Sequence, residues 1–249
     1  MIDLHTHILP GIDDGPVDRR VSLDMARASA AEGIHTIACT SHRRGKYPTL
    51  AQRVHDGIAE LQPLIDAEGI AVKLVSGLEI ALDQVVDMDD DELRLATLGS
   101  GKWLLLEMPF KGWPLELPEL MTALEVRGFK VLLAHPERNE SVQGTPGRLR
   151  ELVGRGALVQ VTACSITGAL GAAPQRSALG LIKSGLAHVI ASDMHNMYGR
   201  VPGILGGLAA AARALDVSAK DLAWMVRDVP QAIIRGAEVR IPASVAQSG

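Results

Sequence analysis

Short apolar runs alternate with amphipathic stretches along almost the whole chain. Between the runs, apolar residues at helical spacing predict helices at Arg20–Glu32, Leu50–Ala67, Leu117–Arg127, Arg148–Arg155 and Gln175–Ser184. The pattern also predicts helices after the last strand, at Leu208–Ala214, Ser218–Arg227 and Val229–Gly236. The runs themselves, rich in β-branched residues, predict strands at Ile2–Leu4, Ile34–Cys39, Val72–Leu78, Trp103–Leu106, Val131–Ala134, Leu158–Ala163 and Val189–Ala191.

Glycines mark the junctions between these helices and strands. Gly33, Gly69, Gly128, Gly156 and Gly185 each stand where a helix C-terminal cap is expected. The pattern therefore predicts a repeated βα unit. The length of 249 residues is usual for one α/β barrel. Because no low-complexity segment or linker divides the chain, we expect a single domain over residues 1–249, with a loose terminus at Ile241–Gly249.

Composition narrows the functional classes. The sequence is 47% hydrophobic and 22% charged, as in a globular protein, and its net charge of -4 gives no basic face for nucleic acid. We expect no membrane insertion, since no apolar run of membrane-spanning length is present. No signal peptide precedes the first strand, and Cys39 and Cys164 read as core residues, so we expect a cytoplasmic protein.

Side chains that can bind metal recur at the predicted strand ends. The positions are separated by 28 to 37 residues, about one βα unit each: His5, His42, Glu79, Glu107, His135, Ala163 and Asp193. All but Ala163 can bind a metal. Since the carboxyl ends of barrel strands meet on one face, these residues are expected to form one site.

Neighbouring residues enlarge this site. His5 and His7 point to the same side of an extended strand, and Gly11 and Gly15 let the chain turn back so that an Asp faces the pair. Asp193 and His195 repeat the spacing of two, whereas His35, His55 and His188 fall elsewhere and are expected to be structural. The candidate ligands number nine: His5, His7, Asp14, His42, Glu79, Glu107, His135, Asp193 and His195.

Nine ligands suggest two or three ions, and the mixture of imidazole and carboxylate suits manganese, iron or zinc. Three divalent ions and four carboxylates would leave about two positive charges, which favours an anionic substrate. Arg138 and Arg200 are candidate phosphate contacts, with Arg43 and Arg44 as a further basic edge. The expected reaction is phosphomonoester hydrolysis by direct in-line attack of a metal-bridging hydroxide, without a phospho-enzyme.

The runs LHTHILPGIDDG, GLEI, LLLEMPF, LLAHPER, SITG and IASDMHN closely resemble one family. It is the PHP-type protein-tyrosine phosphatases of bacterial capsule and exopolysaccharide synthesis, within the polymerase-and-histidinol-phosphatase superfamily. The resemblance implies a distorted (β/α)7 TIM-like barrel, the PHP fold, and a phosphotyrosine substrate on a membrane-associated tyrosine autokinase.

The same resemblance implies three metal ions, usually Mn²⁺, with catalytic roles for Glu79, Arg138 and Arg200. One ion would be held by His5, His7, Glu79 and Asp193, a second by Glu79, Glu107 and His135, and a third by Asp14, His42 and His195. Ser41-His42-Arg43 and Asn139 depart from the family pattern, which usually has Pro-His-His and an aromatic residue there. We expect these departures to alter the rim of the pocket.

Other functions fit parts of the pattern. A cysteine-dependent phosphatase is excluded, because neither Cys39 nor Cys164 is followed by Arg six positions later. A small-molecule phosphatase of the same superfamily, with a substrate like histidinol phosphate, remains open. A metal-dependent amidohydrolase would want a lysine where this chain has Glu79 and Glu107. A non-catalytic scaffold for a kinase is a further alternative, and the oligomeric state is not indicated.

Overall fold

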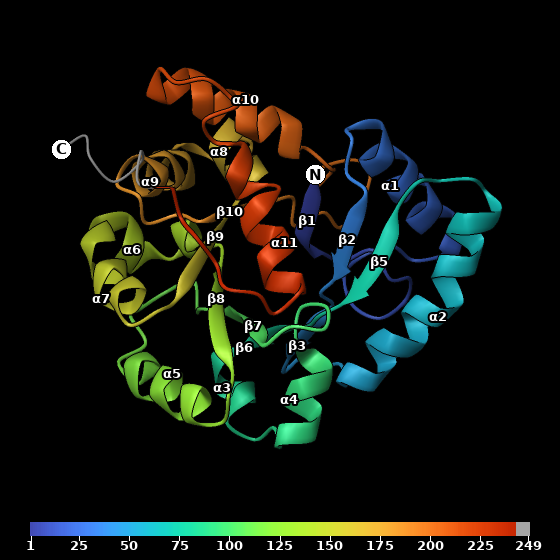
Figure 1. Cartoon of the computed structure of the whole chain (residues 1–249), viewed down its shortest axis with the longest axis horizontal. Helices are drawn as coiled ribbons and strands as arrows, with labels where there is room; N and C mark the ends of the chain where they lie inside the picture. The colour runs from blue at the N-terminus through green and yellow to red at the C-terminus, as the bar shows by residue number, and fades with distance from the viewer. Residues whose placement is uncertain (243–249) are drawn as a thin grey trace.

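The computed structural model describes residues 1–242 and shows a ring of mostly parallel strands enclosed by helices (Figure 1). All seven predicted runs form strands, and most of the predicted loose terminus, residues 243–249, lies outside the described residues. The strands are β1 (Ile2–Thr6), β2 (Thr36–Cys39), β3 (His42–Arg44), β4 (Tyr47–Pro48), β5 (Lys73–Ser76), β6 (Glu79–Ala81), β7 (Trp103–Glu107), β8 (Lys130–Ala134), β9 (Leu158–Thr162) and β10 (Val189–Ala191).

The strands form two sheets that together make one ring with seven strand positions. One has the order β1-β2-β5 and the other the order β10-β9-β8-β7-β6-β3-β4, with only the β3–β4 pair antiparallel. The chain passes from β2 into β3 and from β5 into β6, so each of these pairs fills one position. A bridge between Thr6 and Met194 closes the ring. The expected distorted (β/α)7 barrel is therefore confirmed.

The two interrupted strands correct one detail of the prediction. His42 and Glu79 do not end strands; they begin the second segments, β3 and β6, and pair with each other in register. The interruption in the third position falls at Gly77, where an added Cβ would lie 2.9 Å from side-chain atoms of Leu98 and Thr40. Close packing at this break turns the chain, so the following segment enters the other sheet.

Helices cover the outside of the ring. Their bounds are α1 (Arg19–Ala31), α2 (Ala51–Ala67), α3 (Leu82–Val85), α4 (Asp90–Ala96), α5 (Leu117–Val126), α6 (Glu140–Gly144), α7 (Leu149–Gly154), α8 (Ala163–Thr167), α9 (Ala172–Lys183), α10 (Ile204–Leu215) and α11 (Asp228–Ile234), with short 3₁₀ turns η1 (Pro136–Arg138), η2 (Pro146–Arg148) and η3 (Ala223–Met225). The five predicted glycine caps all have positive φ. Among the described residues, no helix has the length and apolar character to cross a bilayer.

The predicted helix at Ser218–Arg227 is wrong, because only the turn η3 forms there. The backbone N–H of Ser218 donates to the Asp221 carboxylate, and the Ser218 hydroxyl accepts from the N–H of Lys220. These local bonds compete with a helical ladder. The carbonyl of Val226 accepts from the N–H of Ile2, which ties this segment to β1.

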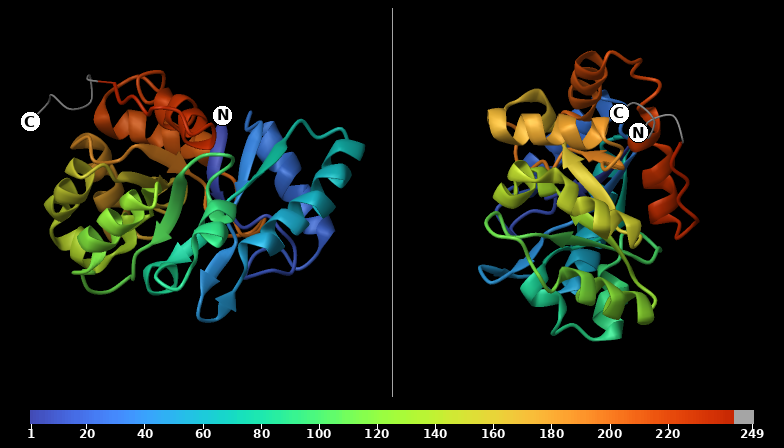
Figure 2. Two further views of the ribbon diagram at one scale, coloured as in Figure 1. Left: turned by 60° about the horizontal axis from the view of Figure 1, so that its bottom comes forward. Right: turned by 90° about the vertical axis from the view of Figure 1, so that its left-hand side faces the viewer.

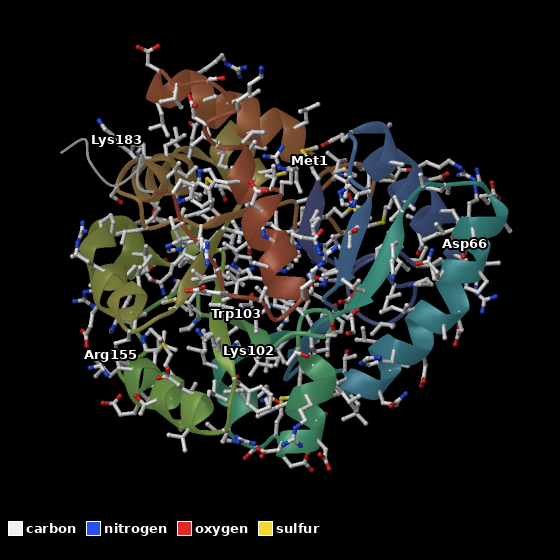
Figure 3. All side chains as sticks on the ribbon, in the orientation of Figure 1. Met1, Asp66, Lys102, Trp103, Arg155 and Lys183 are labelled. Atoms are coloured by element: carbon white, nitrogen blue, oxygen red, sulfur yellow. The ribbon has the colours of Figure 1, made fainter. Side chains whose placement is uncertain are left out.

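The barrel has one covered end and one open end. Helix α11 lies across the ring in Figure 1 and covers the amino end, where the Ile234 carbonyl accepts from Ser100 N–H just before β7. The labelled Asp66, Arg155 and Lys183 side chains lie at the periphery, whereas Trp103 is buried near the centre (Figure 3). At the other end the β3–β4 hairpin projects from the body (Figure 2). The carboxyl ends of the strands are thus available for a site.

Candidate metal centre

All nine candidate ligands meet at the carboxyl end of the barrel. Eight of them are buried, and Asp14 has a side chain 37% exposed. Their donor atoms form four overlapping groups, each with its members within 4.8 Å of one another: His5, His7 and Asp193; His5, Glu79 and His135; His42, Glu79 and Glu107; and His7, Asp14, His42 and His195. Residues spread over 191 positions of sequence, from 5 to 195, therefore share one compact cluster.

The first group has the spacing of a metal coordination sphere. The Nε2 atoms of His5 and His7 are 3.3 Å apart and each lies 3.3 Å from Glu79 Oε2. Asp193 Oδ1 lies 3.4 Å from His5 Nε2 and 3.5 Å from His7 Nε2. A tetrahedral ion with bonds of about 2.0–2.2 Å separates its ligand atoms by about 3.3–3.6 Å. His5, His7 and Asp193 therefore fit around one ion, and Glu79 Oε2 lies beside both histidines.

Glu79 lies between this group and the others. Its Oε1 is 2.8 Å from His135 Nε2, and its Oε2 is 2.7 Å from His42 Nδ1. On the far side of His42, Asp14 Oδ1 lies 3.4 Å from His42 Nε2 and 3.5 Å from His195 Nε2. A single carboxylate at the centre of the cluster can therefore contact more than one ion, as the resemblance implied for Glu79.

Several of these donor atoms make no hydrogen bond to any described residue although they are buried. They are both ring nitrogens of His42, Nε2 of His195, Oε2 of Glu79 and Oδ1 of Asp193. His135 and Asp193 also have positive φ, 33° and 53°, which is uncommon outside glycine. Leaving buried polar atoms unpaired costs about 1–3 kcal/mol each, so such a concentration fits a set of metal ligands.

Asp13 and Gln160 orient the imidazole rings of His7 and His5 from outside the cluster. Asp13 Oδ2 lies 2.7 Å from His7 Nδ1 and accepts from the N–H of His42 at 2.9 Å. His5 Nδ1 lies 3.0 Å from Gln160 Oε1, the same oxygen that accepts from the N–H of His135. These acceptors fix the N–H on Nδ1 and leave both Nε2 atoms facing the cluster.

The sequence analysis missed both of these residues. Asp13 stands beside the chosen ligand Asp14 and gave no signal to tell the two apart. Gln160 is the only amide in an otherwise apolar or hydroxyl-bearing strand, LVQVT, and that contrast could have flagged it.

The turn after His7 takes the predicted form. Gly11 has a φ of 67°, and its N–H donates to the carbonyl of Pro16. A Cβ at Gly15 would lie 2.2 Å from the carbonyl oxygen of His7, so only glycine fits there. This close approach brings Asp13 back against His7.

Two predicted arginines converge on Asp193. Its Oδ2 accepts from Arg138 Nη2 at 2.6 Å and lies 3.4 Å from Arg200 Nη2, while its Oδ1 faces the histidines. Arg138 is largely buried and also contacts Thr162, whereas the Arg200 side chain is 30% exposed. The two guanidinium groups therefore place positive charge beside the cluster, next to Oδ2 of Asp193.

Only one of the other two arginines reaches the site. Arg44 Nη1 lies 3.5 Å from Glu107 Oε2 and its Nη2 lies 3.9 Å from Asp14 Oδ2. Arg43 instead pairs with Glu92 and with the carbonyl of Thr49. The prediction that Arg43 joins the basic edge is wrong, because successive residues of β3 point to opposite faces.

The cluster sets the charge of its own members. Burial alone would raise the pKa of Glu79, but the His5 charge, the hydrogen bond from His135 and the adjacent His42 ring hold it well below its ordinary value. Burial and the neighbouring Glu79 charge raise the pKa of Glu107 to about 7. Burial and the Arg138 charge lower the pKa of His135 to about 4. Glu79 is therefore ionised and His135 neutral near pH 7, the states that metal ligands require. Burial lowers the pKa values of His5 and His7, but the neighbouring carboxylates raise them by more, so a metal bound there would displace protons.

A cavity of about 520 Å³ opens beside the cluster. Its lining includes Glu107, Arg44 and most of the loop from Met108 to Glu116. Asn139 is not on its surface, being only 2% exposed. Asn139 therefore does not itself form the rim, and it contacts the rim through its hydrogen bonds to Pro109 and Gly112.

The three histidines predicted to be structural make their contacts outside the cluster. His188 accepts from the N–H of Val159 at the start of β9, His35 contacts Thr36, and His55 contacts the carbonyl of Leu95. Cys39 and Cys164 are buried free thiols. Their interpretation as structural residues is confirmed.

Comparison with known proteins gives consistent results. Residues 1–235 match the family model described as capsular polysaccharide synthesis, CpsB/CapC. The tyrosine-protein phosphatase YwqE of Bacillus subtilis is 36% identical over 79% of this chain and 78% of its own length. A crystal structure from work on YwqE and Streptococcus pneumoniae CpsB, described as unique metal-dependent tyrosine phosphatases, superposes with a TM-score of 0.87 at 30% identity, covering 96% of both chains. The lactonase Lmo2620 of Listeria monocytogenes has a TM-score of 0.61 at 12% identity over 93% of this chain and 94% of its own, which shows a shared fold alone.

Proposed function

The chain belongs to the CpsB/CapC family of capsular polysaccharide synthesis, and we propose that it is a metal-dependent tyrosine phosphatase of that pathway. Its substrate would be a phosphotyrosine-bearing protein, specifically a membrane-associated tyrosine autokinase that regulates capsule or exopolysaccharide synthesis. We place the activity in the cytoplasm, in keeping with the two free thiols.

One observation supports the proposal most directly: nine metal-binding side chains converge, and several of their buried donor atoms are otherwise unpaired. We propose three divalent ions, with Mn²⁺ as the expected metal. The donor spacing supports His5, His7 and Asp193 from the predicted set of His5, His7, Glu79 and Asp193, and Glu79 lies 3.3 Å from both histidines. Glu107 groups with His42 and Glu79, whereas the prediction placed it with Glu79 and His135. Bound ions would supply Lewis acidity and a water activated at neutral pH.

The chain's own residues would orient the phosphate. Asp193 presents one oxygen to the histidines and the other to Arg138 and Arg200, so a phosphoryl group at the cluster would lie beside both guanidiniums. The Arg138 charge would balance the equatorial oxygens during in-line attack on phosphorus, and the Arg200 charge would chiefly hold the bound phosphate. Arg138, held at 2.6 Å and nearly buried, would be the fixed contact, and the more exposed Arg200 would close on the substrate.

The proposal is tested by hydrolysis of a phosphotyrosine peptide and of histidinol phosphate, each by metal-free protein with manganese added back. We expect manganese-dependent turnover of the peptide that resists thiol alkylation, since both cysteines lie outside the nine-residue cluster. Turnover of histidinol phosphate alone would assign a small-molecule phosphatase. Metal binding without turnover of either compound would favour the scaffold alternative.

A further inference from the structure

An aromatic side chain faces the cavity beside the metal cluster. Phe110, in the loop after β7, is 46% exposed and lines the same cavity as Glu107 and Arg44. Its ring centroid is 6.1 Å from that of His135, with the two planes 12° apart. An exposed ring that stacks beside a candidate metal ligand is positioned to contact whatever group is attached to the reacting phosphate.

The loop that carries Phe110 is fixed from beneath by Asn139. The Asn139 amide Nδ2 donates to the carbonyls of Pro109 and Gly112 at 2.6 and 2.7 Å. The next residue, Glu140, donates its N–H to the carbonyl of Phe110 at 2.9 Å. Three hydrogen bonds from the start of α6 therefore hold residues 109–112 in place.

The Asn139 side chain makes two kinds of hydrogen bond in this arrangement. Its Oδ1 accepts from the N–H of Val142 at 2.9 Å and caps α6, while its Nδ2 holds the loop. Aspartate could still act as the cap but could not donate to the two carbonyls. Asn139→Asp should therefore remove the hydrogen bonds to the loop and keep the cap of α6.

We infer that Asn139 is a positioning residue for an aromatic wall, Phe110, which selects aryl over alkyl phosphomonoesters. The inference rests on the proposed phosphatase function. Glu107 and Phe110 lie three residues apart in the sequence and line the same cavity, so a phosphate at the cluster would direct its ester group along Phe110. A phenyl ring would stack there, whereas the short alkyl chain of phosphoserine offers no ring to stack.

The test compares two peptides of identical sequence, one with phosphotyrosine and one with phosphoserine, in kcat/KM. In Asn139→Asp and in Phe110→Leu the phosphotyrosine-to-phosphoserine ratio should fall about three- to tenfold, the usual worth of one aromatic pair. Inhibition by inorganic phosphate should stay unchanged, because phosphate has no ring. Phe110→Tyr should retain the ratio, as should Leu115→Ala, an exposed change in the same loop.

A double variant that combines Asn139→Asp with Phe110→Leu shows whether Asn139 acts through Phe110. Its loss of selectivity should be no greater than the larger single loss, since removing the wall leaves nothing to position. Additive losses, or equal losses on both peptides, would overturn the inference. Phe110→Leu changes an exposed ring, so it remains informative if Asn139→Asp folds poorly.

Failure of the inference is distinguishable from failure of the proposed function. A wild-type enzyme that hydrolyses both peptides equally overturns the aromatic wall and leaves the phosphatase intact. A wild-type enzyme that hydrolyses neither overturns the proposed function.

Discussion

Replacing Asp13 with asparagine should weaken metal binding although Asp13 is not itself a predicted ligand. Three N–H groups converge on its carboxylate: Oδ2 is 2.7 Å from His7 Nδ1 and 2.9 Å from the His42 nitrogen, and Oδ1 accepts from Gly15 at 3.0 Å. Asparagine has one acceptor oxygen, so its NH₂ group must face at least one of these donors. The His7 ring would lose its fixed orientation.

The size of the effect follows from this geometry. Replacing a residue that orients a metal ligand typically weakens metal affinity 10–100-fold, or about 1.4–2.7 kcal/mol. Because the Asp13 side chain is fully buried and both of its oxygens are used, we expect the upper half of that range. His7 also stacks on His195, with ring centroids 3.8 Å apart, so the disturbance should reach a second donor group.

The assay is a titration of metal-free protein with manganese, followed by bound metal and by phosphatase activity. The matched control is Asp18→Asn, in the same loop, where the carboxylate caps α1 through one bond from Val21 N–H that asparagine can also accept. The half-saturating manganese concentration should rise for Asp13→Asn and stay constant for Asp18→Asn. A titration of Asp13→Asn that superimposes on wild type would refute the role assigned to Asp13.

Three further changes test the site and the fold. Glu79→Gln should remove at least one bound ion and lower kcat at least about 100-fold, whereas Glu137→Gln, also buried but bonded to a backbone N–H, should keep the metal content seen by elemental analysis. Arg200→Ala should raise KM about tenfold with little change in kcat. The control Arg176→Ala, at an exposed position, should leave both constants unchanged. A fall in kcat alone for Arg200→Ala would contradict a binding role. Burial lowers the pKa of His188 from 6.5 to about 4, so between these values the unfolded chain binds a proton that the folded chain does not, and stability falls as pH drops. At about pH 5 the cost is about 2 kcal/mol, and urea unfolding of His188→Asn should show a smaller loss between neutral and acid pH than wild type.

The sequence determined the architecture and the membership of the site. Each of the seven apolar runs forms a strand because a parallel barrel buries its strands on both faces, which leaves a continuous apolar signal. The regular spacing of polar residues at the run ends collected six of the nine candidate ligands, and His7, Asp14 and His195 were added from positions close to them. That inference works because parallel strands share one carboxyl edge, whatever lies between them.

The tertiary structure decided what each side chain does within that site. Asp13 and Asp14 are adjacent in sequence, yet one orients His7 and the other faces His42 and His195. Arg43 and Arg44 likewise separate, one to Glu92 and the other to Glu107. Neighbouring residues of a strand such as β3 face opposite ways, and in the turn after His7 the fold of the backbone separates Asp13 from Asp14, so each role depends on the local backbone path. At the break before Glu79, Gly77 packs closely against Leu98 and Thr40, and such contacts between separate segments are not encoded by a local pattern.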